Sequence, residues 1–233
     1  MTELKPVTPP ADLGWTTPAE IPMRYDAAID IRPTQGFWTR WYRMVFRRKG
    51  IKVGPGLRVL GPLLLQIDGE PANIQLGTNV TLMPGVHLKN REKGRIVLHD
   101  RVTLDTHARL VAANDATIEI GENASVGMGS IINAGRDVTI GRGTITAGYC
   151  YLNVSDHRFA AGVPIRAQGF HHAPIAVGED CWLGAYVYVA RGARIGHGAV
   201  ISAGAVVDGD IPANAICQGR PAVPTRYRRP QEA

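Results

Sequence analysis

Histidine is the residue type in this chain best suited to proton transfer, and its distribution is uneven. The 233-residue sequence contains seven histidines, and three of them, His157, His171 and His172, fall within one short segment. A neutral imidazole accepts a proton near neutral pH and is the side chain that enzymes use most often as a general base. We therefore take the segment that begins at Asp156 and His157 as the candidate site for acid–base chemistry.

The cysteines and the other histidines do not form a metal-binding pattern. Cys150, Cys181 and Cys217 are an odd set without CxxC spacing, so the sequence predicts neither a disulfide framework nor a zinc site. The remaining histidines fall within a six-residue repeat, where we expect structural or solvated roles: His87, His99, His107 and His197.

A six-residue repeat surrounds the candidate segment and must position it. Six aliphatic residues follow one another at this spacing near the C-terminus: Val177, Leu183, Val189, Ile195, Ile201 and Val207. The residue after each is small in five of the six cases. A period of six fits neither a helix nor simple strand alternation. It predicts a triangular prism in which each unit is a short strand plus a corner, three units form one coil, and stacking between coils supplies the stability.

The same phase extends upstream, with short insertions that recur at one corner. Its inward positions form these triplets: Val53, Val59 and Leu65; Leu76, Leu82 and Leu88; Leu98, Leu104 and Leu110; Ile120, Val126 and Ile132; Ile140, Thr146 and Leu152. We count about six coils. A parallel β-helix is therefore expected over residues 53–212, and the break after Leu152 predicts a long loop over 153–176. Such a loop in a regular solenoid is usually functional.

The ends of the chain differ from the repeat. Residues 1–52 predict a Pro-rich arm over 1–35 and an amphipathic helix over 36–50, with these residues on one face: Phe37, Trp41, Met44 and Val45. The helix either covers the open first coil, as solenoids require, or lies with its arginines against an anionic membrane surface. Residues 213–233 predict a basic tail.

The net charge of +6 is concentrated at the two ends of the chain. The body of the repeat is nearly balanced and shows no basic stripe, so we expect no nucleic-acid binding. The start of the sequence lacks the pattern of a signal peptide, and no apolar stretch approaches the ~20 residues that cross a bilayer. We therefore expect a soluble, cytoplasmic protein.

Three segments carry a family resemblance. They are PIAVGEDCWLGAYVYVARGARIGHGAVISAGAVV, the DGDIPANAICQGRPA that follows it, and the loop sequence SDHRFAAGVPIRAQG. The chain resembles the hexapeptide-repeat acetyltransferases, and is most similar to the maltose/galactoside and capsule or O-antigen sugar O-acetyltransferase branch. The resemblance implies an all-β, left-handed parallel β-helix and a homotrimer with active sites between adjacent prisms. It also implies that acetyl-CoA is the co-substrate, that a sugar or glycoconjugate hydroxyl is the acceptor, and that no metal is required.

The resemblance also implies roles for individual residues. His157 matches the loop histidine that deprotonates the acceptor hydroxyl, and Asp156 is positioned in sequence to orient its ring. Acceptor contacts are expected from Asn153, Ser155, His171 and His172. The positions that match the CoA groove are Trp182, Gly184, Ala185, Ala203, Gly204, Ala205, Gly219, Arg220, Pro221 and Arg226.

Two positions depart from the family pattern. Gly127 stands where the family has an acceptor-binding Asn, and Gly209 stands where it often has a Lys near the CoA phosphates. Arg220, Arg226 or Arg228 would have to supply that charge. An amino-sugar N-acetyltransferase and a non-catalytic β-helix assembly protein remain alternatives. A γ-type carbonic anhydrase needs three imidazoles around one zinc, and the sequence has no H-x4-H pair.

Overall fold

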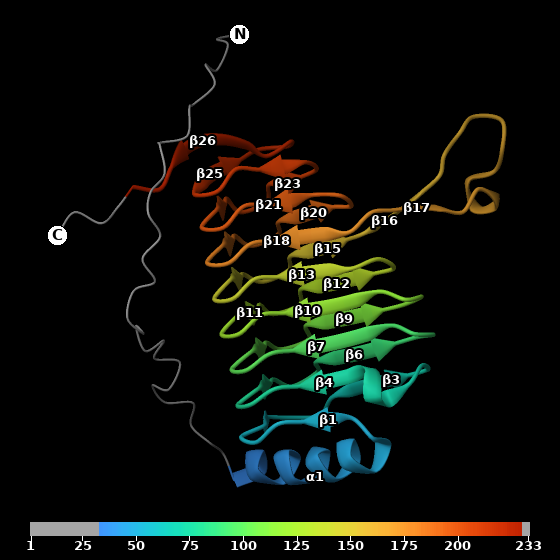
Figure 1. Ribbon diagram of the computed structural model, residues 1–233, viewed down its shortest axis with the longest axis vertical. Coiled ribbons are helices and arrows are strands. Elements are labelled where there is room, and N and C mark those ends of the chain that lie inside the picture. Colours follow the sequence, from blue (N-terminus) through green and yellow to red (C-terminus); the bar gives the residue numbers. More distant parts are fainter. Residues whose placement is uncertain (1–32, 230–233) are drawn as a thin grey trace.

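The computed structural model describes residues 33–229, which form a straight stack of coils with one helix at its lower end (Figure 1). The helix is α1 (Pro33–Lys49), and the rest of the stack consists of short strands. Two single-turn 3-10 helices interrupt it, at Pro71–Asn73 and Ile165–Ala167. Most of the predicted N-terminal arm and the end of the C-terminal tail lie outside the described residues.

Parallel strands form three sheets along the stack. Sheet A contains β1 (Lys52–Val53), β4 (Ile74–Leu76), β7 (Arg95–Leu98), β10 (Thr117–Ile120), β13 (Val138–Ile140), β18 (Ile175–Val177), β21 (Arg194–Ile195) and β24 (Asp210–Ile211). Sheet B contains β2 (Arg58–Val59), β5 (Thr81–Leu82), β8 (Thr103–Leu104), β11 (Ser125–Val126), β14 (Ile145–Thr146), β19 (Trp182–Leu183), β22 (Val200–Ile201), β25 (Ala215–Gln218) and the antiparallel β26 (Val223–Tyr227). Sheet C contains β3 (Leu64–Ile67), β6 (His87–Asn90), β9 (Arg109–Ala112), β12 (Ile131–Ala134), β15 (Tyr151–Asn153), β20 (Tyr188–Ala190) and β23 (Val206–Val207).

The prediction of a parallel β-helix is confirmed, and the number of coils is larger than counted. Sheet C has seven strands, one in each complete coil, and β24 and β25 begin an eighth coil. The count of six was wrong because the triplet that begins at Val53 and both triplets in residues 177–207 all form complete coils.

The interior of the prism is filled by the repeating aliphatic residues, which are buried from the second coil on, whereas Val53 and Leu65 of the first coil are partly buried. Thr146 is a polar exception, and its hydroxyl is satisfied. It donates to the Ser125 carbonyl at 3.1 Å and accepts from the Gly127 N–H at 3.2 Å. The three cysteines are free thiols that also face the interior. Burial raises their pKa values, to about 11 for Cys217, so these thiols act as small apolar side chains.

The helix α1 covers the first coil, but with a different face from the one predicted. Tyr42 and Phe46 are buried there, and the Tyr42 hydroxyl accepts from the Leu63 N–H at 2.7 Å and donates to the Leu63 carbonyl at 3.2 Å. Of the four predicted face residues only Val45 packs on this core. The other three are exposed: Phe37, Trp41 and Met44. The prediction was wrong because the helix has two apolar stripes, and only packing shows which one meets the coil.

The insertions between coils lie at the corner that joins sheet C to sheet A. The predicted long loop leaves the prism at this corner, after β15, and returns at β18. It contains the antiparallel hairpin of β16 (Ser155–His157) and β17 (Phe170–His172). Figure 1 shows this hairpin projecting sideways from the stack, whereas every other connection stays close to it. No helix within residues 33–229 is long and apolar enough to cross a membrane.

The stacked core makes a quantitative prediction about stability. Leu110 is fully buried and lies in register with Leu88 below it and Ile132 above it. Replacing it with Ala leaves a cavity that the neighbouring coils cannot close, so Leu110→Ala should lower the free energy of unfolding by about 3 kcal/mol. Leu64→Ala, at a side chain that is 58% exposed, is the matched control. Urea titrations followed by circular dichroism measure both, and equal losses would contradict this account of the core.

Candidate active site

The base of the projecting loop is fixed by two stacked asparagines. Asn133 and Asn153 occupy the same register position in adjacent coils, and the Asn133 amide nitrogen donates to the Asn153 amide oxygen at 3.1 Å. The Asn153 amide nitrogen donates to the Ser155 carbonyl at 2.7 Å. The Asn153 amide therefore links the Asn133 side chain of the coil below to the Ser155 backbone, at the point where the loop leaves the prism.

The hairpin is ordered by its own polar contacts. Its register pairs Ser155 with His172, Asp156 with His171 and His157 with Phe170. The Ser155 hydroxyl lies 2.7 Å from the His172 Nδ1. At the far end, Gln168 bonds both the N–H and the carbonyl of Ala160, at 2.7 and 3.0 Å. These bonds give the hairpin a defined shape although it has no buried core of its own.

His157 is exposed at the end of β16, and its ring packs against the ring of Phe170 with centroids 4.2 Å apart. Within the described part of the chain this imidazole has no hydrogen-bond partner. Both ring nitrogens are therefore open to a ligand, and the aromatic contact limits the directions in which the ring can point.

The Asp156 carboxylate faces away from the His157 ring. Neighbouring residues of a strand point to opposite sides, and Asp156 Oδ2 accepts from Arg191 Nε at 2.8 Å. Arg191 follows β20, so this ion pair ties the hairpin to the next coil. Among residues 33–229, the contact of this carboxylate is with Arg191 rather than with the histidine that the sequence led us to expect.

Several residues matched to the CoA groove lie together at the corner between sheets B and C. Trp182 is 53% exposed on the outer face of β19. Gly184 and Ala185 follow it, and Ala203 and Gly204 lie one coil further along, where the Gly204 N–H donates to the Ala185 carbonyl at 2.8 Å. Glycine is needed at 184, because a Cβ there would lie 2.6 Å from the Ala203 nitrogen. Gly184 itself is buried, with its N–H bonded to the Ile201 carbonyl and its carbonyl accepting from Cys150 Sγ, so the exposed residues of this corner are Trp182 and Ala203.

Ala205 differs from the other residues of that group. It is buried, its N–H donates to the Ser202 carbonyl and its own carbonyl accepts from Tyr188. Its side chain therefore faces the core and is not available to a ligand.

The C-terminal arginines have different roles. Gly219, Arg220 and Pro221 form the turn between β25 and β26, and Arg220 Nε donates to the Gly204 carbonyl at 2.8 Å, which brings this side chain to the same corner. Arg228 is held by the Asp180 carboxylate at 2.8 Å and by the Gly198 carbonyl at 3.0 Å. Arg226 is exposed on β26 and has no partner among the described residues. The Arg220 side chain thus lies at this corner, and the exposed Arg226 side chain lies at the same end of the prism.

The hairpin and this corner are not adjacent within one chain. The hairpin leaves from the corner between sheets C and A, whereas Trp182 and Gly184 lie at the corner between sheets B and C. The two sets of residues therefore flank opposite edges of sheet C. Figure 1 shows the hairpin directed away from the prism. One copy of the chain does not bring His157 and Trp182 into one pocket.

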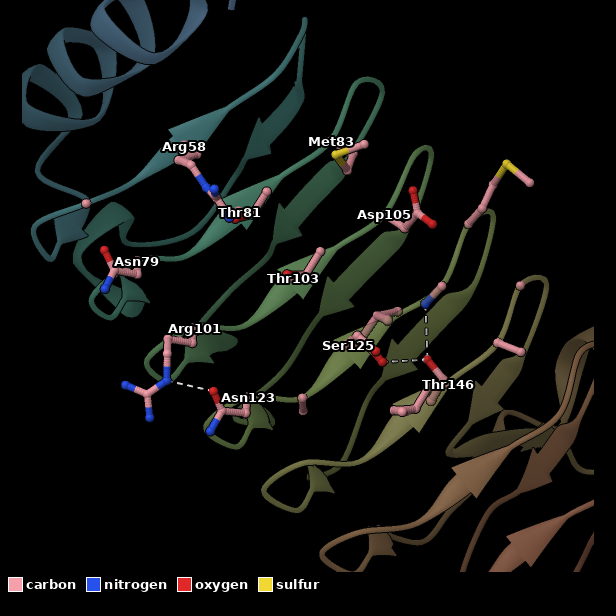
Figure 2. Close-up of a pocket in the computed structure, with 18 residues that line it drawn as sticks. Arg58, Asn79, Thr81, Met83, Arg101, Thr103, Asp105, Asn123, Ser125 and Thr146 are labelled. Atoms are coloured by element: carbon pink, nitrogen blue, oxygen red, sulfur yellow. Dashed lines mark hydrogen bonds between the residues drawn. The ribbon is translucent and has the colours of Figure 1, made fainter. Parts of the chain in front are cut away.

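A groove of about 850 Å³ on the outer face of sheet B was missed by the sequence analysis (Figure 2). It crosses five strands from β2 to β14, and its floor is made of Arg58, Thr81, Thr103, Ser125 and Ile145. Gly127, where the family Asn is missing, lies on its rim. These floor residues are about twenty positions apart in sequence. The sequence would have revealed these floor residues if the outward-facing residue of each two-residue strand had been identified.

Comparison with known proteins shows which proteins this chain is similar to. Residues 174–209 match the family described as bacterial transferase hexapeptide (six repeats). The solved structure of a maltose O-acetyltransferase from Clostridium difficile has a TM-score of 0.50 and 19% sequence identity, and the match covers 85% of this chain and 81% of that one. Residues 174–209 thus match a hexapeptide-repeat model, and the left-handed parallel β-helix that the sequence predicted is confirmed as the fold.

Two curated relatives are more similar in sequence. A probable acetyltransferase of Mycobacterium tuberculosis is 33% identical over 156 residues, which are 66% of this chain and 50% of the relative. The galactoside O-acetyltransferase of Escherichia coli is 33% identical over 107 residues, which are 46% of this chain and 52% of that enzyme. The chain therefore spans about half the length of these relatives. It is similar to the sugar O-acetyltransferases, as predicted.

The ion pair between Asp156 and Arg191 yields a prediction about the hairpin. Arg191→Ala removes the link to the next coil, so amide hydrogens of residues 155–172 should exchange faster, while the melting temperature changes little because the pair is exposed. Arg194→Ala, an exposed arginine on β21, is the matched control. Hydrogen exchange with mass spectrometry measures the effect. Unchanged exchange in the hairpin would show that the ion pair does not hold it.

Proposed function

We propose that this protein transfers the acetyl group of acetyl-CoA to a hydroxyl of a sugar or glycoconjugate, with His157 as the general base. The observation that carries this proposal is the open imidazole of His157, held on the hairpin that, within residues 33–229, projects from the prism into solvent. The names of the curated relatives, which include a galactoside O-acetyltransferase, support an acetyl donor and a sugar acceptor.

The reaction needs a base because a sugar hydroxyl is a poor nucleophile. The neutral His157 imidazole takes the hydroxyl proton as the oxygen attacks the thioester carbonyl. The tetrahedral intermediate collapses, the carbon–sulfur bond breaks, and the thiolate leaves as CoA while the imidazolium returns the proton to sulfur. The products are the acetyl ester and CoA–SH. General base catalysis of this kind is typically worth 10²–10⁴-fold in rate.

The corner around Trp182 fits the donor. An extended pantetheine chain carries amide groups that need polar partners, and Ala203 is exposed at this corner one coil beyond Ala185. Arg220 and Arg226 supply charge for the phosphates of CoA, in place of the Lys that is missing at Gly209. No group of acidic, His or Cys side chains in residues 33–229 is arranged as a metal site, and this reaction route does not call for one.

The separation of His157 from Trp182 supports assembly between copies. Because the two residues flank opposite edges of sheet C, a complete site needs the hairpin of one prism beside the donor corner of another. A closed ring of three prisms supplies three such junctions. We therefore propose the homotrimer that the resemblance implies. In this arrangement Asn153, Asp156 and Ser155 act as positioning residues for the hairpin.

Replacing the base tests the function. His157→Ala should lower kcat by at least about 100-fold, while acetyl-CoA binding and molecular mass stay unchanged, since the side chain holds no other part of the fold. His99→Ala, at an exposed position on the prism outside the proposed site, is the matched control. Thiol release from acetyl-CoA is measured against sugars, nucleotide sugars, glycolipids and amino sugars. Full activity of His157→Ala would remove this residue from the mechanism, and turnover of amino sugars alone would establish N-acetyl transfer instead.

We further propose that the outer face of α1 rests on an anionic membrane surface. Phe37 and Trp41 stack with ring centroids 6.3 Å apart and are 58% and 46% exposed. Met44 continues their stripe along the helix, and four arginines flank it: Arg40, Arg43, Arg47 and Arg48. The helix has no acidic residue. Aromatic side chains beside arginines favour the interface of a bilayer that carries negative lipids.

Vesicle flotation tests this surface. The protein should float with vesicles of phosphatidylcholine and phosphatidylglycerol but not with phosphatidylcholine alone. Arg40→Gln with Arg47→Gln should weaken partitioning at least about 10-fold, and Trp41→Ser should also weaken it. Leu64→Ser and Arg95→Gln, at exposed positions on β3 and β7, are the matched controls. If partitioning does not depend on lipid charge, or if the helix variants do not change it, α1 serves only to cover the first coil.

A further inference from the structure

The floor of the groove on sheet B is a row of aligned side chains that changes from charged to polar to apolar along the prism. Cross-strand register aligns one residue from each of five coils: Arg58, Thr81, Thr103, Ser125 and Ile145. Arg58 Nε donates to the Thr81 hydroxyl at 3.2 Å and helps to bury it. Thr103 and Ser125 are half-buried, and neither hydroxyl has a hydrogen-bond partner within residues 33–229. The middle of the groove thus offers two open hydroxyl groups about 4.8 Å apart.

The rim of the groove at the corner between sheets B and C has a carboxylate in one coil and no side chain in the next. The residue after the inward aliphatic position is Asp105 in the third coil and Gly127 in the fourth. Gly127 has no side chain, and a Cβ there would lie 2.5 Å from the Ala147 backbone. Asp105 Oδ1 is fixed by the Thr106 N–H at 2.6 Å, which leaves its other oxygen open. Figure 2 shows this carboxylate standing at the turn beside the groove.

We propose that this groove binds an extended oligosaccharide acceptor that runs along the coils, with its reacting unit at the upper end beside Gly127 and Ala147. The inference rests on the proposed function, because it uses the same prism face as the donor corner. Trp182 follows Ile145 directly in the register of sheet B. An acceptor in the groove therefore ends where the exposed indole begins.

The dimensions and chemistry of the groove favour a chain of sugars over a single one. Five parallel strands span about 19 Å, so roughly four sugar units fit if each covers one coil. The Thr103 and Ser125 hydroxyls and the Asp105 carboxylate bond sugar hydroxyls without requiring charge on the ligand. At the lower end, Arg58 adds a positive charge, which favours chains that carry a carboxylate there.

Chain-length dependence tests the proposal. Maltooligosaccharides and α2,8-linked oligosialic acids of one to six units serve as probes, and both acetyl transfer and binding without acetyl-CoA are measured. With at least one series, binding should tighten and kcat/KM should rise with length up to about four units. Thr103→Trp, which fills the groove, should return the hexamer to the level of the single sugar. Thr103→Val with Ser125→Ala should weaken hexamer binding at least about 5-fold, as expected for two lost hydrogen bonds.

The control is Thr139→Trp, the same change at an exposed position on β13 of sheet A. Light scattering shows whether each variant keeps the mass of the wild-type assembly. Length-independent binding, or equal behaviour of Thr103→Trp and its control, overturns the proposal. A change of assembly mass on Thr103→Trp overturns it as well, since the groove would then be an interface with a second copy. Hexamer binding without any acetyl transfer would preserve the groove and overturn the proposed function alone.

Discussion

Backbone hydrogen bonding between successive coils is the constraint on which the rest of this structure depends. The strands of the prism are only two to five residues long, and the prism is built from parallel ladders that join each coil to the next. The coils stack so closely that a corner such as Gly184 cannot carry a Cβ without striking the coil above. The lower end of such a stack has unpaired groups and an open core, which Tyr42 and Phe46 cover.

The same constraint decides where chemistry can be placed. Extra residues are tolerated only at the corners, where the chain passes from one ladder to the next. In this chain the insertions lie at the corner between sheets C and A. His157, the proposed base, lies on the loop at this corner and outside the prism, so ligands can reach it. The proposed donor corner at Trp182 has an exposed indole ring but, within one chain, no base beside it. The proposed trimer would bring the two together at each junction between copies.

The repeat could be predicted because it is a property of single positions along the chain, whereas the contacts of the site depend on pairs that are distant in sequence. Val177 and Leu183 reveal the period directly, and the loop follows from its interruption. The ion pair between Asp156 and Arg191 joins residues that are 35 positions apart and lie in adjacent coils. The sequence could not show this pairing, so it suggested the neighbouring His157 as the partner of Asp156. The face of α1 that packs was missed because both stripes are apolar. The open hydroxyl groups of the groove were missed because Thr103 and Ser125 become neighbours only when the length of each coil, insertions included, is known.

The two ends of the prism give the proposed acceptor a direction. The helix α1 packs against the first coil, which also contributes Arg58, the lower end of the groove. Trp182 lies in the sixth coil, so the donor corner stands about 25 Å above the helix. If α1 lies on a bilayer, a single sugar attached to a lipid stays at the first coil and does not reach the thioester. A chain of several sugars does reach it, running from the membrane along Thr103 and Ser125 to the donor corner. The proposed membrane face of α1 and the proposed acceptor groove would therefore both suit a lipid-linked oligosaccharide, although they share no residue.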